Sequence, residues 1–219
     1  MNSEQATSYI EWSSHIWKVK NENISGPGPN IWSNSNLNVW IDTEGNLHLK
    51  IIKNMNNWIC SEIISLQSFG YGEYTFKVSS NIELLDKNIV LGLFTYENDK
   101  KEIDLEFTRK GIASNPAGWY VVQPSTRRSE FNFPLNLTGD FTTHKFIWSS
   151  SEILFQSYHG HSTEHLMSKW NYIGRFIPSA HNEKVHLNLW LNKGYTPSHQ
   201  QESEVIIKSF NFTKIELNG

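Results

Sequence analysis

The feature that most constrains the fold of this chain is a succession of short segments in which apolar and polar residues alternate. LNVWI (37–41) and LHLKIIK (47–53) show this alternation, and turn-forming residues occupy 42–46 between them. Successive side chains of a strand point to opposite faces, so the two segments predict half-buried strands joined as a β-hairpin. No segment keeps a 3.6-residue apolar period over a dozen residues, so long amphipathic helices are not expected.

Similar segments continue along the chain and predict an all-β fold. They are 58–66, 74–79, 89–96, 102–107, 118–123, 144–149, 152–158, 184–191 and 204–217. Many short strands separated by turn residues are typical of a jelly-roll β-sandwich of two antiparallel sheets. The chain has no internal repeat or linker-like segment, so residues 1–219 are interpreted as a single domain. The loops expected to line a ligand cleft are 80–88, 108–117, 124–143, 159–183 and 192–203.

The composition excludes some classes of partner. The formal net charge is −3, so no basic excess is available to bind a phosphate backbone, and nucleic acid is not an expected partner. No apolar run approaches the ~18 residues of a membrane span, and a monomer is expected. The N-terminal residues lack the apolar stretch of a signal peptide. Localisation therefore stays open between the cytoplasm and, with a leader outside this sequence, secretion or the periplasm.

Two residue types outside the strand pattern carry limited information. Aromatic residues make up 13% of the chain, with nine Trp, which suits strand cores and also suits stacking on the C–H faces of sugars. The single cysteine, Cys60, cannot form an internal disulfide and is expected to be a buried thiol.

The segment EIDLEF (102–107) carries the most informative chemical pattern. Alternation turns its apolar residues toward the core and its three acids toward the other face; the acids are Glu102, Asp104 and Glu106. Neighbouring carboxylates raise the pKa of at least one of the group. A protonated carboxylic acid beside ionised carboxylates is what glycoside hydrolysis needs, because one group protonates the leaving oxygen while another attacks or activates water.

Other interpretations of this strand stay open from the residues alone. The acids could form the solvated face of an edge strand, or three carboxylates could bind Ca²⁺ or Mg²⁺, although a straight strand spaces them poorly around one ion. Spacing also constrains the glycosidase interpretation. Glu102 and Glu106 lie about 13 Å apart along a flat strand, whereas catalytic carboxyl pairs are ~5–9.5 Å apart, so the strand must curve or the side chains must lean together.

The acidic strand and its flanking segments resemble glycoside hydrolase family 16, the lichenases, laminarinases and their relatives. EIDLEF matches the E-x-D-x-E signature of the family. GPGPNIWSNSNLNVWIDTEGNLHLKI resembles the N-terminal entry and first hairpin, and CSEIISLQSFGYGEYTFKV resembles the strand pair with a Y-G-x-Y/F element. FTTHKFIW, through His144 and Trp148, is similar to F-H-x-Y-x-x-W, and Pro178 followed by HLNLW is similar to I-P…M-N-L-W. Their order and spacing agree over most of the chain.

The resemblance implies a concanavalin A-like jelly roll whose concave sheet carries a cleft for a polysaccharide or oligosaccharide. It implies a retaining, endo-acting hydrolase or transglycosylase of β-linked polysaccharide, with Glu102 as nucleophile and Glu106 as general acid/base. Asp104 would modulate the charge of both. Three further residues fall where the family has cleft residues: Glu62, Gln123 and Trp190. Without the resemblance these would be a solvated acid, a loop amide and a core indole.

The sequence also departs from the family pattern. Lys100–Lys101 stands where an aromatic residue is usual, Ile64 replaces an arginine, and Pro124–Ser125 replaces an Asn-containing stretch. These departures leave the polysaccharide and its linkage undetermined. An acidic or sulfated glycan would suit the cations near the strand, unless they are scattered surface charge; they are Lys100, Lys101, Arg109, Arg127 and Arg128.

No metal or cofactor is expected. Asn211 stands where the family often has an acid that holds structural calcium. Three histidines in HGHSTEH (159–165) have spacing that zinc can use, but the segment is polar and lacks a second ligand cluster. The alternative to an enzyme is a non-catalytic carbohydrate-binding jelly-roll module, in which the acids only bind sugar hydroxyls.

Overall fold

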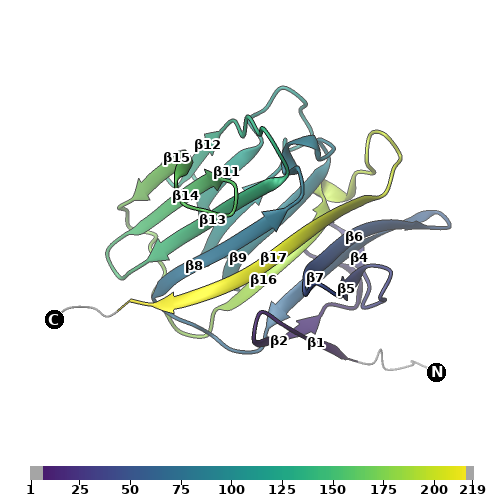
Figure 1. Cartoon of the computed structure of the whole chain (residues 1–219), viewed down its shortest axis with the longest axis horizontal. Helices are drawn as coiled ribbons and strands as arrows, with labels where there is room; N and C mark the ends of the chain where they lie inside the picture. The colour runs from purple at the N-terminus through teal and green to yellow at the C-terminus, as the bar shows by residue number, and fades with distance from the viewer. Residues whose placement is uncertain (1–6, 216–219) are drawn as a thin grey trace.

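The computed structural model describes residues 7–215 and contains two β-sheets that pack together (Figure 1). Sheet 1 contains, in spatial order, β1 (Ser8–Trp12), β2 (His15–Val19), β7 (Asn57–Ser65), β16 (Lys184–Leu191), β9 (Ile89–Asn98), β10 (Lys101–Phe107), β11 (Gly118–Val122) and β12 (Glu130–Phe133). Sheet 2 contains β5 (Val39–Ile41), β6 (Leu47–Asn54), β17 (Ser203–Lys214), β8 (Gly72–Ser79), β13 (Phe141–Trp148), β14 (Ile153–His159) and β15 (His165–Tyr172).

The remaining elements are short and join the two sheets. Strands β3 (Glu22–Ser25) and β4 (Asn30–Trp32) form a small ribbon, and β4 pairs in parallel with β7. Strand β7 also pairs with the end of β6, which makes the hydrogen-bonded network continuous. Two 3₁₀ turns, η1 (Ile82–Leu84) and η2 (Asn192–Gly194), lie in loops. The predicted all-β jelly-roll sandwich is confirmed. Within residues 7–215, no helix has the length and apolar character to span a membrane.

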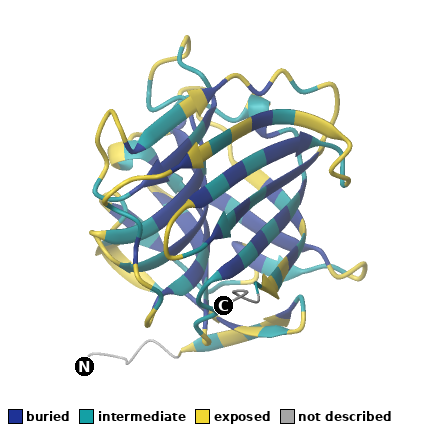
Figure 2. Cartoon of the chain, turned by 90° about the vertical axis from the view of Figure 1, so that its left-hand side faces the viewer, coloured by how far each residue is buried: buried dark blue, intermediate teal, exposed yellow. Residues whose placement is uncertain are grey.

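The core lies between the two sheets and is rich in aromatic rings. Along many strands, such as β2 and β8, buried residues alternate with more exposed ones, as Figure 2 shows. Tyr120 of β11 stacks on Phe155 of β14 with ring centroids 5.0 Å apart, and its hydroxyl donates to Ser157 Oγ at 2.7 Å. Each fully buried large apolar side chain stabilises the fold by roughly 1.5–3 kcal/mol. The aromatic layer therefore holds sheet 1 firmly on sheet 2.

His144 lies in this core directly behind the acidic strand. Its ring packs 4.3 Å from the ring of Phe107 on β10, and both ring nitrogens are hydrogen-bonded, to Ser157 Oγ and Thr142 Oγ1. Burial lowers the pKa of His144 to about 3, so the imidazole is neutral at ordinary pH. A neutral, fully bonded histidine supports the strand without placing a charge behind the acids.

Six strands were not predicted from the sequence: β1, β2, β3, β4, β12 and β15. The β1–β2 hairpin turns on Ser13–Ser14, and both serines have positive φ, 50° and 62°. Two-residue turns of this type favour Asn-Gly or Asp-Gly, so a Ser-Ser turn gives a weak sequence signal. Strands β12 and β15 lie at sheet edges, where half-exposed polar residues obscure the alternation.

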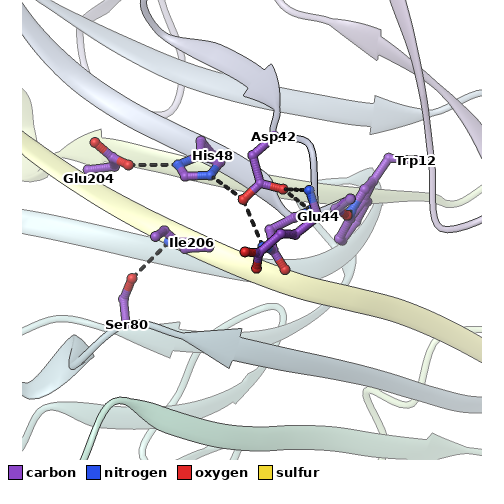
Figure 3. Close-up of polar contacts among 9 residues, drawn as sticks. Trp12, Asp42, Glu44, His48, Ser80, Glu204 and Ile206 are labelled. Atoms are coloured by element: carbon purple, nitrogen blue, oxygen red, sulfur yellow. Dashed lines mark hydrogen bonds and ion pairs between the residues drawn. The ribbon is translucent and has the colours of Figure 1, made fainter.

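A polar cluster on sheet 2 ties the β5–β6 turn to strand β17 (Figure 3). His48 of β6 contacts Glu204 Oε1 through Nδ1 at 2.7 Å and Asp42 Oδ2 through Nε2 at 3.2 Å. The ring of Trp40 stacks on the imidazole at 4.5 Å. Asp42 also accepts the backbone N–H groups of Glu44 and Asn46, so the turn and the long C-terminal strand are fastened through one histidine.

We predict that His48→Ala lowers the free energy of unfolding by about 1–3 kcal/mol, because two carboxylates lose their buried partner. His165→Ala is the matched control: it removes an exposed imidazole from edge strand β15 and is expected to change stability by less than about 0.5 kcal/mol. Urea denaturation at pH 7 measures both. Equal losses in the two variants would contradict the role assigned to His48.

Candidate functional site

Strand β10 places the three acids on the outer face of sheet 1. Its apolar residues are completely buried on the core side: Ile103, Leu105 and Phe107. Strand β10 lies between β9 and β11, with Asp104 opposite Phe94 and Val121, and Asp104 is only 4% exposed. The interpretation of an acidic stripe on a solvated edge strand is therefore wrong, because the strand is internal and its central acid is buried.

The acids line a hollow of about 250 Å³ on this face. Glu102, Asp104 and Glu106 form one wall, and Gln123 and Trp190 belong to the same lining. The structure thus brings together five of the six residues that the sequence predicted for the site.

A second hollow of about 380 Å³ adjoins the first and contains the sixth predicted residue, Glu62. Glu102, Phe94 and Pro27 line both hollows, so the two form a continuous cleft at the Glu102 end of β10. Pro27 comes from the Gly-Pro-Gly-Pro turn before β4, so a loop outside the sheet also contributes to the cleft lining.

All three acids of β10 have a raised pKa. Burial raises the pKa of Glu102 to about 7, with the charge of Glu106 adding to the effect. Burial and the neighbouring carboxylates raise the pKa of Asp104 well above its usual range, and a hydrogen bond with Glu102 favours the protonated form of Asp104. Burial also raises the pKa of Glu106, while Lys110 lowers it in part. The cluster therefore retains protons near neutral pH.

Glu62 behaves in the opposite way because Lys20 and His186 contact its carboxyl group directly. Burial opposes its ionisation, but His186 Nδ1 at 2.6 Å and Lys20 Nζ at 3.0 Å outweigh this and lower its pKa. Lys20 also donates to the carbonyl oxygen of Gly26 and lies 4.2 Å over the ring of Trp32. Glu62 is thus a buried carboxylate that holds the turn at 26–29 against the cleft, not the solvated acid that the sequence alone allows.

Lys110 lies beside the other end of the acid row. Its Nζ is 3.9 Å from Glu106 Oε2 and 3.8 Å from the ring centroid of Trp119. Trp119 is the β11 residue paired with Glu106, so the cation lies over the wall of the cleft next to this carboxyl group. Neither Lys110 nor Trp119 was predicted as a site residue.

Asn188 is the most informative site residue that the sequence analysis missed. Neither polar atom of its side chain has a hydrogen-bond partner among the described residues, although the residue is fully buried and lines the cleft. Opposite it, a Cβ on Gly92 would lie 2.5 Å from Asn188 Oδ1, so only glycine leaves room for the amide. The alternation in HLNLW places Asn188 on the same face as Trp190, a signal that could have identified it.

The cations next to β10 are mostly engaged elsewhere. Lys101 pairs with Glu97 at 3.1 Å, and the Arg109 guanidinium donates to the carbonyl oxygens of Ala113 and Asn115. Lys100 is exposed beyond the end of the strand. Arg127 and Arg128 lie on the loop after β11 and do not line the cleft.

No metal centre is formed among residues 7–215 by a group of three or more His, Cys, Asp or Glu side chains. His161 bonds to the carbonyl oxygen of Val78, and His159 and His165 pair across β14 and β15. Asn211 donates to Thr213 Oγ1. Among the described residues, the histidine segment therefore does not bring three metal ligands together.

Comparison with solved structures shows the same fold over nearly the whole chain. Bacillus licheniformis β-glucanase is 19% identical, with a TM-score of 0.67 and coverage of 97% of this chain and 100% of that one. A lichenase from a mouse hindgut metagenome is 19% identical, with a TM-score of 0.69 and coverage of 96% and 99%. A Mycobacterium tuberculosis antigen described as a pseudo β-1,3-glucanase is 17% identical, with a TM-score of 0.71 and 91% coverage of both chains. No curated protein sequence matches.

A jelly roll with an acid-lined cleft on one sheet is the architecture of a β-glycan hydrolase. The sequence profile of glycosyl hydrolases family 16 matches residues 28–208, which is most of the 219-residue chain. The chain belongs to this family, and the resemblance seen in the sequence is confirmed.

We predict that Asp104→Asn makes the protein more stable at pH 8. Below pH ~4 the carboxyl group is protonated in both the folded and the unfolded chain, so it contributes nothing. As the pH rises above ~4 the unfolded chain releases the proton, whereas the folded chain, with its raised pKa, retains it, and stability falls. Asparagine removes this loss, so the melting temperature rises at pH 8 and changes little at pH 4.

Differential scanning calorimetry at the two pH values measures the effect. Asp140→Asn, which neutralises an exposed acid, is the matched control and is expected to leave the melting temperature unchanged at both. A lower melting temperature for Asp104→Asn at pH 8 would show that the carboxylate stabilises the fold.

Proposed function

We propose that the protein is a retaining, endo-acting hydrolase or transglycosylase of β-linked polysaccharide. The observation that carries this proposal is the set of three acids on one internal strand, which share a single cleft and all have a raised pKa. A sugar-binding module has no chemical need for carboxyl groups that retain protons near neutral pH, whereas acid/base catalysis requires such groups.

The proposed reaction has two steps. In the first, protonated Glu106 gives its proton to the glycosidic oxygen, and ionised Glu102 attacks the anomeric carbon as the leaving sugar departs. In the second, Glu106, now ionised, removes a proton from water or from a sugar hydroxyl, whose oxygen displaces Glu102 from the anomeric carbon. Two displacements at one carbon retain its configuration. Asp104 keeps its proton and donates a hydrogen bond to Glu102, which favours the ionised nucleophile.

The remaining cleft residues are suited to holding sugar rings. Trp190 and Phe94 offer aromatic surfaces to sugar rings. The Phe94 ring stacks on the His186 imidazole with ring centroids 4.9 Å apart, and this contact orients the Phe94 and His186 rings. Asn188 supplies a free amide donor and acceptor for sugar hydroxyls, and Gln123 supplies a second amide. Glu62 acts from behind them by fixing His186.

We predict that Glu102→Gln and Glu106→Gln each reduce polysaccharide hydrolysis by at least about a thousandfold, because each removes a group that acts at the reacting bond. Mixed-linkage and 1,3-β-glucans, agars, carrageenans and xyloglucan form the substrate screen, and released reducing ends are the measurement. Circular dichroism checks that both variants remain folded. Near-normal turnover by either variant would contradict the assignment.

An aryl glycoside of the sugar found in the hydrolysed polysaccharide separates the role of Glu102 as nucleophile from that of Glu106 as acid/base. Its leaving group needs no protonation, so Glu106→Gln should still release the aryl alcohol in a first burst, whereas Glu102→Gln should release none. Proton NMR of the first product distinguishes retention from inversion. A protein that binds one of these glycans tightly but hydrolyses none of them would instead be the non-catalytic module.

We predict that Lys110→Gln moves the alkaline limb of the pH–activity profile to higher pH. Activity falls on that limb as Glu106 loses the proton it must donate. Lys110 stabilises the Glu106 carboxylate and lowers its pKa, so its removal raises that pKa and extends activity upward. Lys100→Gln removes an exposed cation and is the matched control. A downward shift, or equal shifts in both variants, would contradict this.

A further inference from the structure

A third hollow, of about 670 Å³, lies outside the cleft and is lined by three arginines. Arg127 and Arg128 come from the loop between β11 and β12, and Arg175 comes from the segment after β15. We propose that these arginines bind the sulfate or carboxylate groups of an acidic polysaccharide whose chain occupies the cleft. This proposal rests on the glycan-hydrolase function for the nature of its ligand and specifies its substrate class.

The arginines have no anionic partner among the residues that the structure describes. No Asp or Glu lines the hollow, and within residues 7–215 none of the three guanidinium groups takes part in an ion pair. Three like charges gathered at one place repel each other, so an external anion that neutralises them would be bound favourably. The planar guanidinium group presents paired N–H donors that match two oxygens of a carboxylate or a sulfate ester.

The loop that carries Arg127 and Arg128 is braced from within. Ser129 is fully buried, and its hydroxyl donates to the carbonyl oxygen of Pro124 at 3.0 Å and accepts from the Thr126 N–H at 2.9 Å. The Ser129 N–H in turn donates to the carbonyl oxygen of Thr126. These bonds close the loop on itself, so the two arginines are presented from a defined turn.

The segment that carries Arg175 is held against a buried tyrosine. Gly174 lies so close to Tyr172 that an added Cβ would be 2.5 Å from the hydroxyl oxygen, and the Phe176 N–H donates to that hydroxyl at 3.4 Å. The Arg175 guanidinium lies 4.6 Å from the Phe176 ring centroid, a cation–π contact that orients it. The hollow therefore combines three donors with an aromatic wall.

The two segments that carry the arginines join strands of the cleft. The Arg127–Arg128 loop starts directly after Gln123, which lines the cleft and whose backbone N–H bonds to the carbonyl oxygen of Glu102. The segment that contains Arg175 leads into β16, whose first residue, Lys184, pairs with Tyr96 beside Glu102. Both loops therefore join the sheet at the Glu102 end of the site. A polysaccharide that extends out of the cleft at this end would meet them.

Binding is tested in a Glu102→Gln background, so that no probe is consumed. Isothermal titration calorimetry at ~0.15 M salt, where surface charges are screened beyond ~8 Å, compares three oligosaccharide probes: sulfated κ-carrageenan, carboxylated polymannuronate and neutral laminarin. The triple substitution Arg127→Gln, Arg128→Gln, Arg175→Gln removes three positive charges from the hollow. The matched control removes three exposed lysines from sheet 2: Lys53→Gln, Lys208→Gln and Lys214→Gln.

We expect the triple arginine substitution to weaken the binding of one anionic probe at least tenfold. The triple lysine substitution should change the affinity for that probe by less than twofold. The probe whose affinity falls identifies sulfate or carboxylate as the ligand. Substituting the same arginines by lysine should lose part of this affinity, because the charge stays but the paired donors are lost. Equal losses in both triples, or no binding of either anionic probe, would overturn the proposal.

Failure of the glycosidase function would look different. Every binding measurement is made without turnover, so affinity alone tests the arginine site. Absence of hydrolysis by the unsubstituted protein across the polysaccharide screen would contradict only the enzymatic function, whereas hydrolysis of a neutral glucan without anion binding would contradict only the arginine site.

Discussion

The structure depends on one constraint, the two-residue alternation of strand β10. The same backbone turns three fully buried apolar residues into the core and three acids into the cleft. The apolar side is packed against the neutral ring of His144, so the strand cannot slip by one residue without exposing its core side chains and burying its acids in the sandwich. Packing energy on one face thereby fixes the positions of the reactive groups on the other.

Placing three acids on an internal strand costs free energy, and the same burial and repulsion produce the raised pKa values of the site. Carboxyl groups close together on an internal strand lose hydration and repel one another, so their pKa values rise and protons stay bound. Glu62 lies on β7, separated from β10 by β9 and β16, yet its pKa is lowered because Lys20 and His186 contact it directly. Acids of one chemical type thus have pKa values shifted in opposite directions by their neighbours.

Positive charge is distributed unevenly around the cleft. Lys20 is paired with Glu62 and Lys101 with Glu97, whereas Lys110 lies beside Glu106 at the cleft. The three arginines of the 670 Å³ hollow have no carboxylate partner within residues 7–215. A cation paired inside the protein orients structure, and an unpaired one remains available to a ligand. Pairing therefore separates the cations that support the structure from those proposed to select the substrate. Nearness to β10 in the sequence could not make this separation.

The sequence by itself determined the all-β class, the strand that carries the acids and the family, because period-two alternation and the E-x-D-x-E spacing are local properties of the chain. It did not reveal the β1–β2 hairpin, whose Ser-Ser turn lacks the usual residues, or the edge strands β12 and β15. Tertiary structure alone decided which groups meet: Lys20 and Glu62 are 42 residues apart in the chain, and His186 and Glu62 are 124 apart. Burial, charge pairing and the missing hydrogen-bond partner of the Asn188 amide arise from contacts between distant strands, so local alternation can place such a residue on a face but cannot show what surrounds it.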